Sequence, residues 1–133
     1  MARYRPYVLT DRSWLLASDK LADLTKEVID FRDARNWSQF HNAKDVAISL
    51  SLEASELLEL FQWKTDADLA EHLINAKQQI GEELSDILYW TLLLAHDLQI
   101  DLPTAFMEKL RSNAVKYPIA KARDSSAKYD QLD

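Results

Sequence analysis

The chain has 133 residues, enough for one domain with a single core, and its net charge of −6 argues against a general electrostatic attraction to nucleic acid or an anionic membrane. One glycine and three prolines are too few for the turns of a many-stranded sheet, so an all-α fold is favoured. The lack of cysteine excludes disulfides and thiolate metal ligands, and no stretch approaches the roughly 20 apolar residues of a membrane span, so we expect a cytoplasmic protein.

The first predicted helix lies near the N-terminus. Residues 1–18 show no clear helical period and are predicted to form an arm, whereas residues 19–133 are predicted to form one helical domain. Ser18 and Asp19 are good N-cap residues. Apolar residues then recur at three- and four-residue steps until about Ala34, which is typical of an amphipathic helix. These residues are Leu21, Leu24, Val28 and Phe31.

Three further long helices are predicted after a polar and aromatic loop at residues 35–45. They run from about Asp45 to Phe61, from about Lys77 to Leu98, and from Asp101 to just before Pro118. A short helix capped by Asp66 is predicted between the first two of these, and the tail is predicted to be irregular. Four main helices without repeats or a linker predict a four-helix bundle.

Two pairs of acidic residues lie in helices that are otherwise apolar. Glu53 and Glu56 are three residues apart, and Glu83 and Asp86 have the same spacing. Residues at this spacing share a helix face, so antiparallel packing of the two helices could bring all four carboxylates together. Divalent cations would relieve their repulsion, and ligation by oxygen alone favours Mg²⁺ or Mn²⁺ over Zn²⁺.

Each pair taken alone has a simpler explanation, because most short acidic motifs are solvated helix faces. Two pairs flanked by leucine, alanine and isoleucine favour a metal site more strongly. A di-iron bundle would need Glu-x-x-His on two helices, and no glutamate here has a histidine three residues later.

Magnesium sites usually take further ligands from substrate phosphates, so the acidic pairs favour a phosphoanhydride hydrolase. Gly81 is the only glycine, which rules out most glycine-rich phosphate loops.

Aromatic residues flank the second long helix at both ends. Trp37 and His41 precede it and Trp63 follows it. A nucleobase stacks well on such rings, at about 1 to 3 kcal/mol each, but the rings could equally close the bundle ends or an oligomer interface. Polar residues at helix ends are candidate phosphate or sugar contacts, although ordinary solvated surface is the simpler explanation for each lysine alone. These candidates are Lys44, Asn113, Lys116, Tyr117 and Lys121.

Four stretches together resemble the MazG-like all-α nucleoside triphosphate pyrophosphatases, and most closely their dCTP pyrophosphatase branch. They are NWSQFH (36–41), SLEASELLELFQWK (51–64), GEELSDILYW (81–90) and SNAVKYPIAKARDSSAKYDQL (112–132). The Glu-x-x-Glu and Glu-x-x-Asp signature is loose by itself, and the FQWK, EELSD and KYP stretches make it specific. The resemblance covers the chain from about residue 19 onward.

The resemblance implies hydrolysis of a nucleoside triphosphate between its α and β phosphates, with Mg²⁺ and with water as the nucleophile. The implied metal ligands are Glu53, Glu56, Glu83 and Asp86, and Glu82 is a candidate base beside them. The implied base pocket consists of Trp37, His41 and Trp63. The implied phosphate and sugar contacts, some of them from a neighbouring subunit, are Lys44, Asn113, Lys116 and Tyr117.

The chain departs from some relatives at two positions. It has Val28 where they carry a histidine in the first helix, and Trp90 where they carry a tyrosine one turn after the second acidic pair. Both positions could touch the nucleotide, so base and sugar preference stay open. The resemblance also implies a homo-oligomer, a dimer or homotetramer, which agrees with helices that are apolar over much of their surface.

The sequence therefore predicts a Mg²⁺-dependent hydrolase of dCTP or a related nucleotide that sanitises the nucleotide pool, without a nucleic-acid or membrane partner. Two alternatives remain at this point. In one, a non-catalytic helical oligomerisation module binds metal and nucleotide without turnover. In the other, the chain is a purely structural bundle whose acidic residues face solvent.

Overall fold

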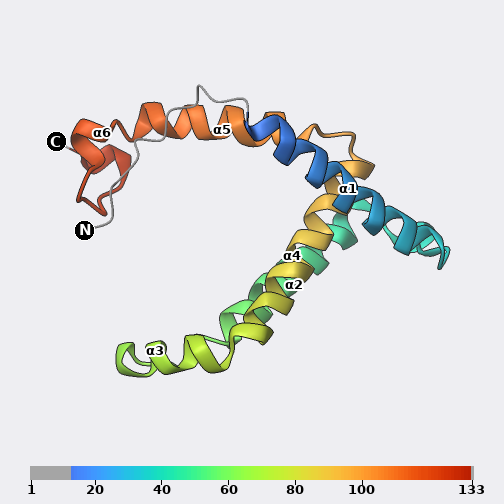
Figure 1. The fold of residues 1–133 in the computed structure, drawn as a ribbon, viewed down its shortest axis with the longest axis horizontal. Helices are drawn as coiled ribbons and strands as arrows, with labels where there is room; N and C mark the ends of the chain where they lie inside the picture. The colour runs from blue at the N-terminus through green and yellow to red at the C-terminus, as the bar shows by residue number, and fades with distance from the viewer. Residues whose placement is uncertain (1–12, 133) are drawn as a thin grey trace. The chain divides into compact units, whose positions relative to one another are not determined.

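The structure is a computed structural model that describes residues 13–132, with side chains from Lys20 onward. This range is helical and contains no strand (Figure 1), which confirms the all-α fold. The chain divides into two units, the first ending at Leu98 and the second beginning at Gln99. The four-helix bundle and the division into an arm (1–18) and one domain (19–133) stay predictions. No helix in the described range is long and apolar enough to cross a membrane.

The first helix, α1 (Ser13–Asp33), starts earlier than predicted. The sequence analysis placed its cap at Ser18 or Asp19, inside the observed helix. A run of good helix formers without glycine or proline explains the longer helix, since Leu15, Leu16 and Ala17 extend it upstream. Residues 1–12 of the predicted arm lie outside the described residues.

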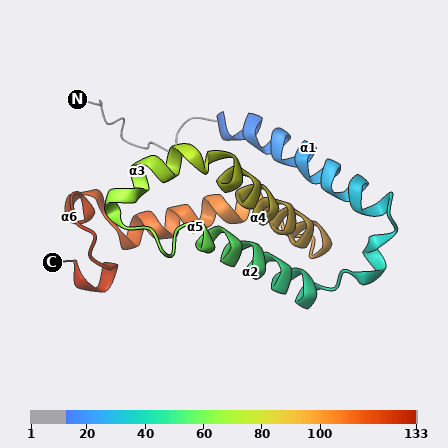
Figure 2. The same ribbon diagram turned by 90° about the horizontal axis from the view of Figure 1, so that it is seen from below.

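The helices α2 (Ala43–Glu59) and α4 (Lys77–Asp97) form the centre of the first unit and pack along each other (Figures 1 and 2). The two helices run antiparallel. Glu53 of α2 contacts Trp90 of α4, and Glu56, which comes later in α2, lies near Glu83, which comes earlier in α4. The helix α2 begins at Ala43, two residues before the predicted start, because Asn42 caps it: the side-chain oxygen of Asn42 accepts the backbone N–H of Asp45 at 3.0 Å.

Two short helices complete the first unit: η1 (Trp37–Phe40), inside the predicted loop before α2, and α3 (Asp66–Asn75), which precedes α4. Thr65, rather than the predicted Asp66, caps α3. The carboxylate of Asp68 accepts the Thr65 hydroxyl at 2.6 Å and the Thr65 backbone N–H at 3.3 Å. These two hydrogen bonds lower the pKa of Asp68.

A buried ion pair joins the C-terminal ends of α1 and α4. The guanidinium of Arg32, only 6% exposed, donates from one nitrogen to both carboxylate oxygens of Asp97 at 2.8 and 2.9 Å. It also donates to the more exposed Asp33 at 2.9 Å. Burial acts to raise the pKa of Asp97, but hydrogen bonds from Arg32 and His96 outweigh it and hold that pKa below its usual value.

Asp97→Asn is expected to reduce the free energy of unfolding by about 2 kcal/mol at pH 7, because it leaves the buried guanidinium of Arg32 without its main partner. Asp97 is partly exposed and Arg32 keeps Asp33, so the loss falls below that of a fully buried pair. Because the folded-state pKa of Asp97 is lowered, the stabilisation is fully present above the unfolded-state pKa near 4 and is lost as the pH falls from there through the lower folded-state pKa. Urea unfolding at several pH values measures both effects, with Asp33→Asn as the matched control. Equal losses in the two variants would contradict the prediction.

The second unit contains α5 (Leu102–Lys116), α6 (Ile119–Ala122) and η2 (Tyr129–Gln131). The predicted cap of α5 is confirmed, since the carboxylate of Asp101 accepts the backbone N–H of Thr104 at 3.1 Å. The prediction of an irregular tail is wrong where α6 and η2 form. The rings of Tyr117 and Tyr129 meet edge to face with 6.0 Å between centroids, which folds the tail back onto the end of α5.

Candidate active site

The acidic cluster consists of three carboxylates, those of Glu53 and Glu56 on α2 and of Glu83 on α4. One oxygen of each lies within 4.8 Å of the others. The three-residue spacing puts the two α2 side chains on one helix face, and the antiparallel packing brings Glu83 opposite them. The structure therefore brings together three of the four carboxylates that the sequence analysis singled out.

Glu83 occupies the least favourable position in the acidic cluster. Its Oε2 atom is buried and has no hydrogen-bond partner among the described residues. Burial raises the pKa of Glu83, and the negative charges of Glu56 and Glu53 raise it further. A buried acceptor without a partner is rare in folded proteins, and a bound cation would satisfy it. The acidic cluster therefore fits a divalent cation that prefers oxygen ligands, and could hold one.

The other two acidic residues of the prediction lie beside the acidic cluster. Asp86, one turn after Glu83, lines the neighbouring cavity together with Glu53. Glu82 is exposed, and its Oε1 atom accepts a hydrogen bond from Nε2 of Gln78 at 2.9 Å. The charges of Asp86 and Glu82 both contribute to the raised pKa of Glu83, so the negative field extends past the three clustered carboxylates.

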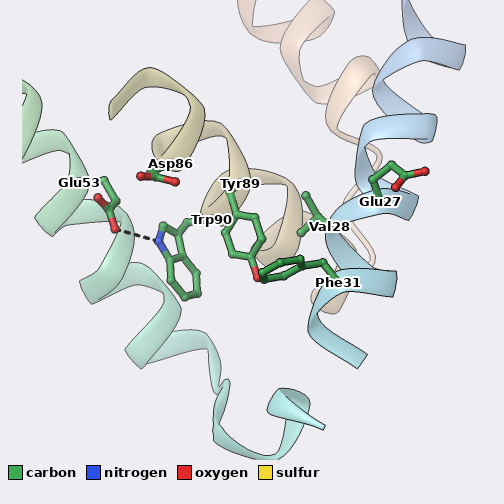
Figure 3. A pocket seen from close by; sticks show the side chains of 7 residues that line it. All are labelled: Glu27, Val28, Phe31, Glu53, Asp86, Tyr89 and Trp90. Carbon is green, nitrogen blue, oxygen red and sulfur yellow. Dashed lines mark hydrogen bonds between the residues drawn. The ribbon is translucent and has the colours of Figure 1, made fainter. Parts of the chain in front are cut away.

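A cavity of about 520 Å³ adjoins the acidic cluster. Its lining residues come from α1, α2 and α4 (Figure 3): Glu27, Val28, Phe31, Glu53, Asp86, Tyr89 and Trp90. The rings of Tyr89 and Trp90 meet edge to face at 5.0 Å, and those of Phe31 and Tyr89 at 6.2 Å. An aromatic wall next to carboxylates suits a ligand with a flat ring at one end and negatively charged groups at the other, provided that a cation bridges these groups to the carboxylates.

Two of the three predicted base contacts lie against the wall of this cavity. The Trp37 ring meets Phe31 edge to face at 5.9 Å, and the His41 ring meets Trp90 at 5.4 Å. The Nδ1 atom of His41 is buried and has no hydrogen-bond partner among the described residues. Each residue supports a ring of the wall, and neither lines the cavity itself.

Two of the remaining predicted contacts in the first unit do not line the cavity. Trp63, in the turn after α2, is 85% exposed, and the exposed Lys44 has its Nζ atom 3.9 Å from Asp45. Asn113, Lys116 and Tyr117 belong to the second unit. The Nζ atom of Lys116 lies 5.2 Å from the centroid of the Tyr129 ring. Neither Trp63 nor Lys44 lines the cavity.

The sequence analysis missed Phe31 and Tyr89 of the aromatic wall, and it named Trp90 and Val28 as nucleotide contacts only through the resemblance. Tyr89 follows Asp86 by three residues, and this spacing could have identified it as a neighbour of the acidic residues on the same face of α4. The contribution of α1, through Val28 and Phe31, depends on how that helix packs against α4. No local signal in the sequence contains that information.

Comparisons with known proteins show the family to which the chain belongs. The family model described as the MazG-like family matches residues 48–132. The chain is 38% identical over 114 residues to dCTP pyrophosphatase 1 of Homo sapiens and 37% identical to that of Rattus norvegicus. Each alignment covers 84% of this chain and 67% of the relative. The chain belongs to the MazG-like family, and its resemblance to the dCTP pyrophosphatase branch is confirmed.

A solved structure supports the same assignment. The crystal structure of a pyrophosphatase from Archaeoglobus fulgidus superposes with a TM-score of 0.67 at 31% sequence identity. The match covers 89% of this chain and 99% of the archaeal one. The similarity therefore extends over nearly the whole archaeal fold and is not confined to the residues around the acidic pairs.

Proposed function

We propose that this MazG-like protein hydrolyses dCTP, or a closely related or modified nucleotide, to the monophosphate and pyrophosphate. The acidic cluster directly beside an aromatic cavity carries the proposal, since this arrangement suits the two chemically different ends of a nucleoside triphosphate. The dCTP pyrophosphatases of mammals and the archaeal pyrophosphatase support the reaction class, and the protein is a nucleoside triphosphate pyrophosphohydrolase.

In this proposal the metal is Mg²⁺, and its ligands are Glu53, Glu56, Glu83 and Asp86. When bound, the ion neutralises phosphate charge and lowers the pKa of water. The carboxylates would hold the ion, and through it the phosphates, next to the aromatic cavity, because the acidic cluster and the cavity share Glu53. We assign to the exposed Glu82, next to Glu83 in the chain, the role of the base that takes a proton from the attacking water.

The nucleobase is proposed to enter the aromatic cavity, with Trp37 and His41 supporting its rings from behind. We propose further contacts to base, sugar or phosphate from residues at the ends of helices. They are Trp63, Lys44, Asn113, Lys116 and Tyr117. Val28 and Trp90 line the cavity and stand where some relatives carry histidine and tyrosine, so they are the first positions to examine for base preference.

We also infer that the protein forms a homo-oligomer, either a dimer or a tetramer. Ile48 and Leu52 on α2 and Leu84 and Leu88 on α4 are exposed, and Leu52 and Leu84 are 57% and 52% exposed. Large side chains at four-residue spacing form apolar stripes, which in a soluble protein usually meet a partner. Light scattering tests the inference, and a monomer at all concentrations would contradict it.

Product analysis tests the proposed reaction. The purified protein is incubated with Mg²⁺ and a panel of canonical and modified nucleoside triphosphates, and the products are separated by chromatography. Monophosphate and pyrophosphate in equal amounts are expected, with dCTP or a related nucleotide turned over fastest. Diphosphate with phosphate would show cleavage of the wrong bond. Stabilisation by a nucleotide without any turnover would instead support a non-catalytic nucleotide-binding module.

A further inference from the structure

A single side-chain hydrogen bond connects α2 with α4 in the described part of the chain. The indole N–H of Trp90 donates to the Oε1 atom of Glu53 at 3.2 Å (Figure 3). The two residues are 37 positions apart, so the bond depends on the packing of the helices. Glu53 also belongs to the acidic cluster, and therefore Trp90 contacts a carboxylate that is a candidate metal ligand.

The ring of Trp90 is itself held on two sides. Tyr89 meets it edge to face at 5.0 Å and nearly perpendicular, and His41 meets it at 5.4 Å with an interplanar angle of 72°. Trp90 is half-buried, so these neighbours restrict its rotation. An indole nitrogen can only donate, which makes a carboxylate oxygen its natural acceptor. One oxygen of Glu53 is thus held, and the other is left free of this bond.

The same indole forms part of the cavity wall beside the acidic cluster. Its edge contacts Glu53, and its rings border the space proposed for the nucleobase. We propose that Trp90 is a positioning residue, which orients the Glu53 carboxylate for a divalent cation and so links the nucleobase cavity to the metal site. The inference rests on the proposed function, because it takes the acidic cluster to be the cation site.

Two substitutions separate this role from simple packing. Trp90→Phe keeps an aromatic ring against Tyr89 and His41 but removes the N–H donor. Trp90→His keeps a ring N–H close to the indole nitrogen but gives up the larger ring. At pH 8 the imidazole is neutral, and Mg²⁺ prefers oxygen ligands, so the new histidine does not replace a carboxylate. Tyr89→Phe is the matched control for metal binding, since it changes a neighbouring ring without touching Glu53.

Calorimetric titration of Mg²⁺ into the metal-free protein, without nucleotide, provides the first readout, and thermal melting of the same samples provides the second. We expect Trp90→Phe to raise the Mg²⁺ Kd about tenfold, in the range typical of lost hydrogen bonds to metal ligands. Trp90→His should restore most of the affinity although it melts at a lower temperature than Trp90→Phe. Tyr89→Phe should bind Mg²⁺ as the wild type does.

The outcomes distinguish this inference from the proposed function. If Trp90→Phe binds Mg²⁺ like the wild type, or if Trp90→His binds it more weakly than Trp90→Phe, Trp90 acts through packing and the inference is overturned. If the wild type hydrolyses a nucleotide in a Mg²⁺-dependent manner but the variants do not show the expected Mg²⁺ Kd values, the proposed function stands and only the inference about Trp90 is overturned. If the wild type neither binds Mg²⁺ nor hydrolyses any nucleotide, both fail together.

Discussion

Glu56→Gln is expected to reduce nucleotide turnover by about 1000-fold while raising the melting temperature of the metal-free protein. The amide keeps the size of the side chain but removes one of the three clustered negative charges. After burial, the charge of Glu56 is the strongest cause of the raised pKa of Glu83, so its removal relieves repulsion in the folded state. Initial rates at saturating Mg²⁺ and melting in the presence of a chelator measure the two effects.

Glu59→Gln is the matched control for this variant. Glu59 lies one turn further along α2 with an exposed side chain, and it does not belong to the acidic cluster. The control loses the same charge from the same helix, so wild-type turnover is expected. Equal losses in the two variants would show that net charge, rather than the acidic cluster, is what turnover requires. Full activity of Glu56→Gln would show that turnover does not require the Glu56 carboxylate.

Removal of divalent metal is expected to abolish turnover completely, and added Mg²⁺ should restore it. The metal-free acidic cluster contains a buried Glu83 oxygen without a partner, and a cation would neutralise the repulsion around it. A ligand present at 100 times its Kd stabilises the folded state by about 2.7 kcal/mol, so Mg²⁺ should also raise the melting temperature.

Melting of Glu83→Gln with increasing Mg²⁺ tests whether the ion binds at the acidic cluster. This variant is expected to lose most of the stabilisation by Mg²⁺, whereas Glu59→Gln should keep it. Turnover that survives exhaustive chelation would exclude a metal role. A rise in melting temperature that is the same in Glu83→Gln and in the wild type would place the ion elsewhere on the protein.

Much of the helical structure was predictable because it depends on local patterns. The helix predicted from Lys77 to Leu98 matches α4 within one residue at its C-terminal end, since its apolar residues keep a steady period. Errors occurred at helix starts. The side chain of Asn42 caps α2 earlier than predicted, and α1 begins at Ser13, since no glycine or proline interrupts the chain between Ser13 and the predicted cap at Ser18 or Asp19.

The site was predictable only to the extent that helical spacing determines it. Spacing by three residues places Glu53 with Glu56, and the meeting of both with Glu83 followed from assuming antiparallel packing. The cavity was not predictable in this way, because Phe31 reaches Tyr89 across nearly sixty positions of the chain. Its width depends on the packing of α1 against α4, a tertiary property that no short motif specifies.

The ion pair between Arg32 and Asp97 has a consequence for recognition. Phe31, whose ring lines the cavity, directly precedes Arg32, whose guanidinium is buried against α4. Apolar contacts alone would let one helix slide along another, but two directional hydrogen bonds fix α1 at a single register. We therefore expect the wall on α1 to be preorganised, so that a nucleobase that enters the cavity as proposed avoids part of the entropic cost of ordering this wall. The shape of the cavity would then discriminate against bases of the wrong size.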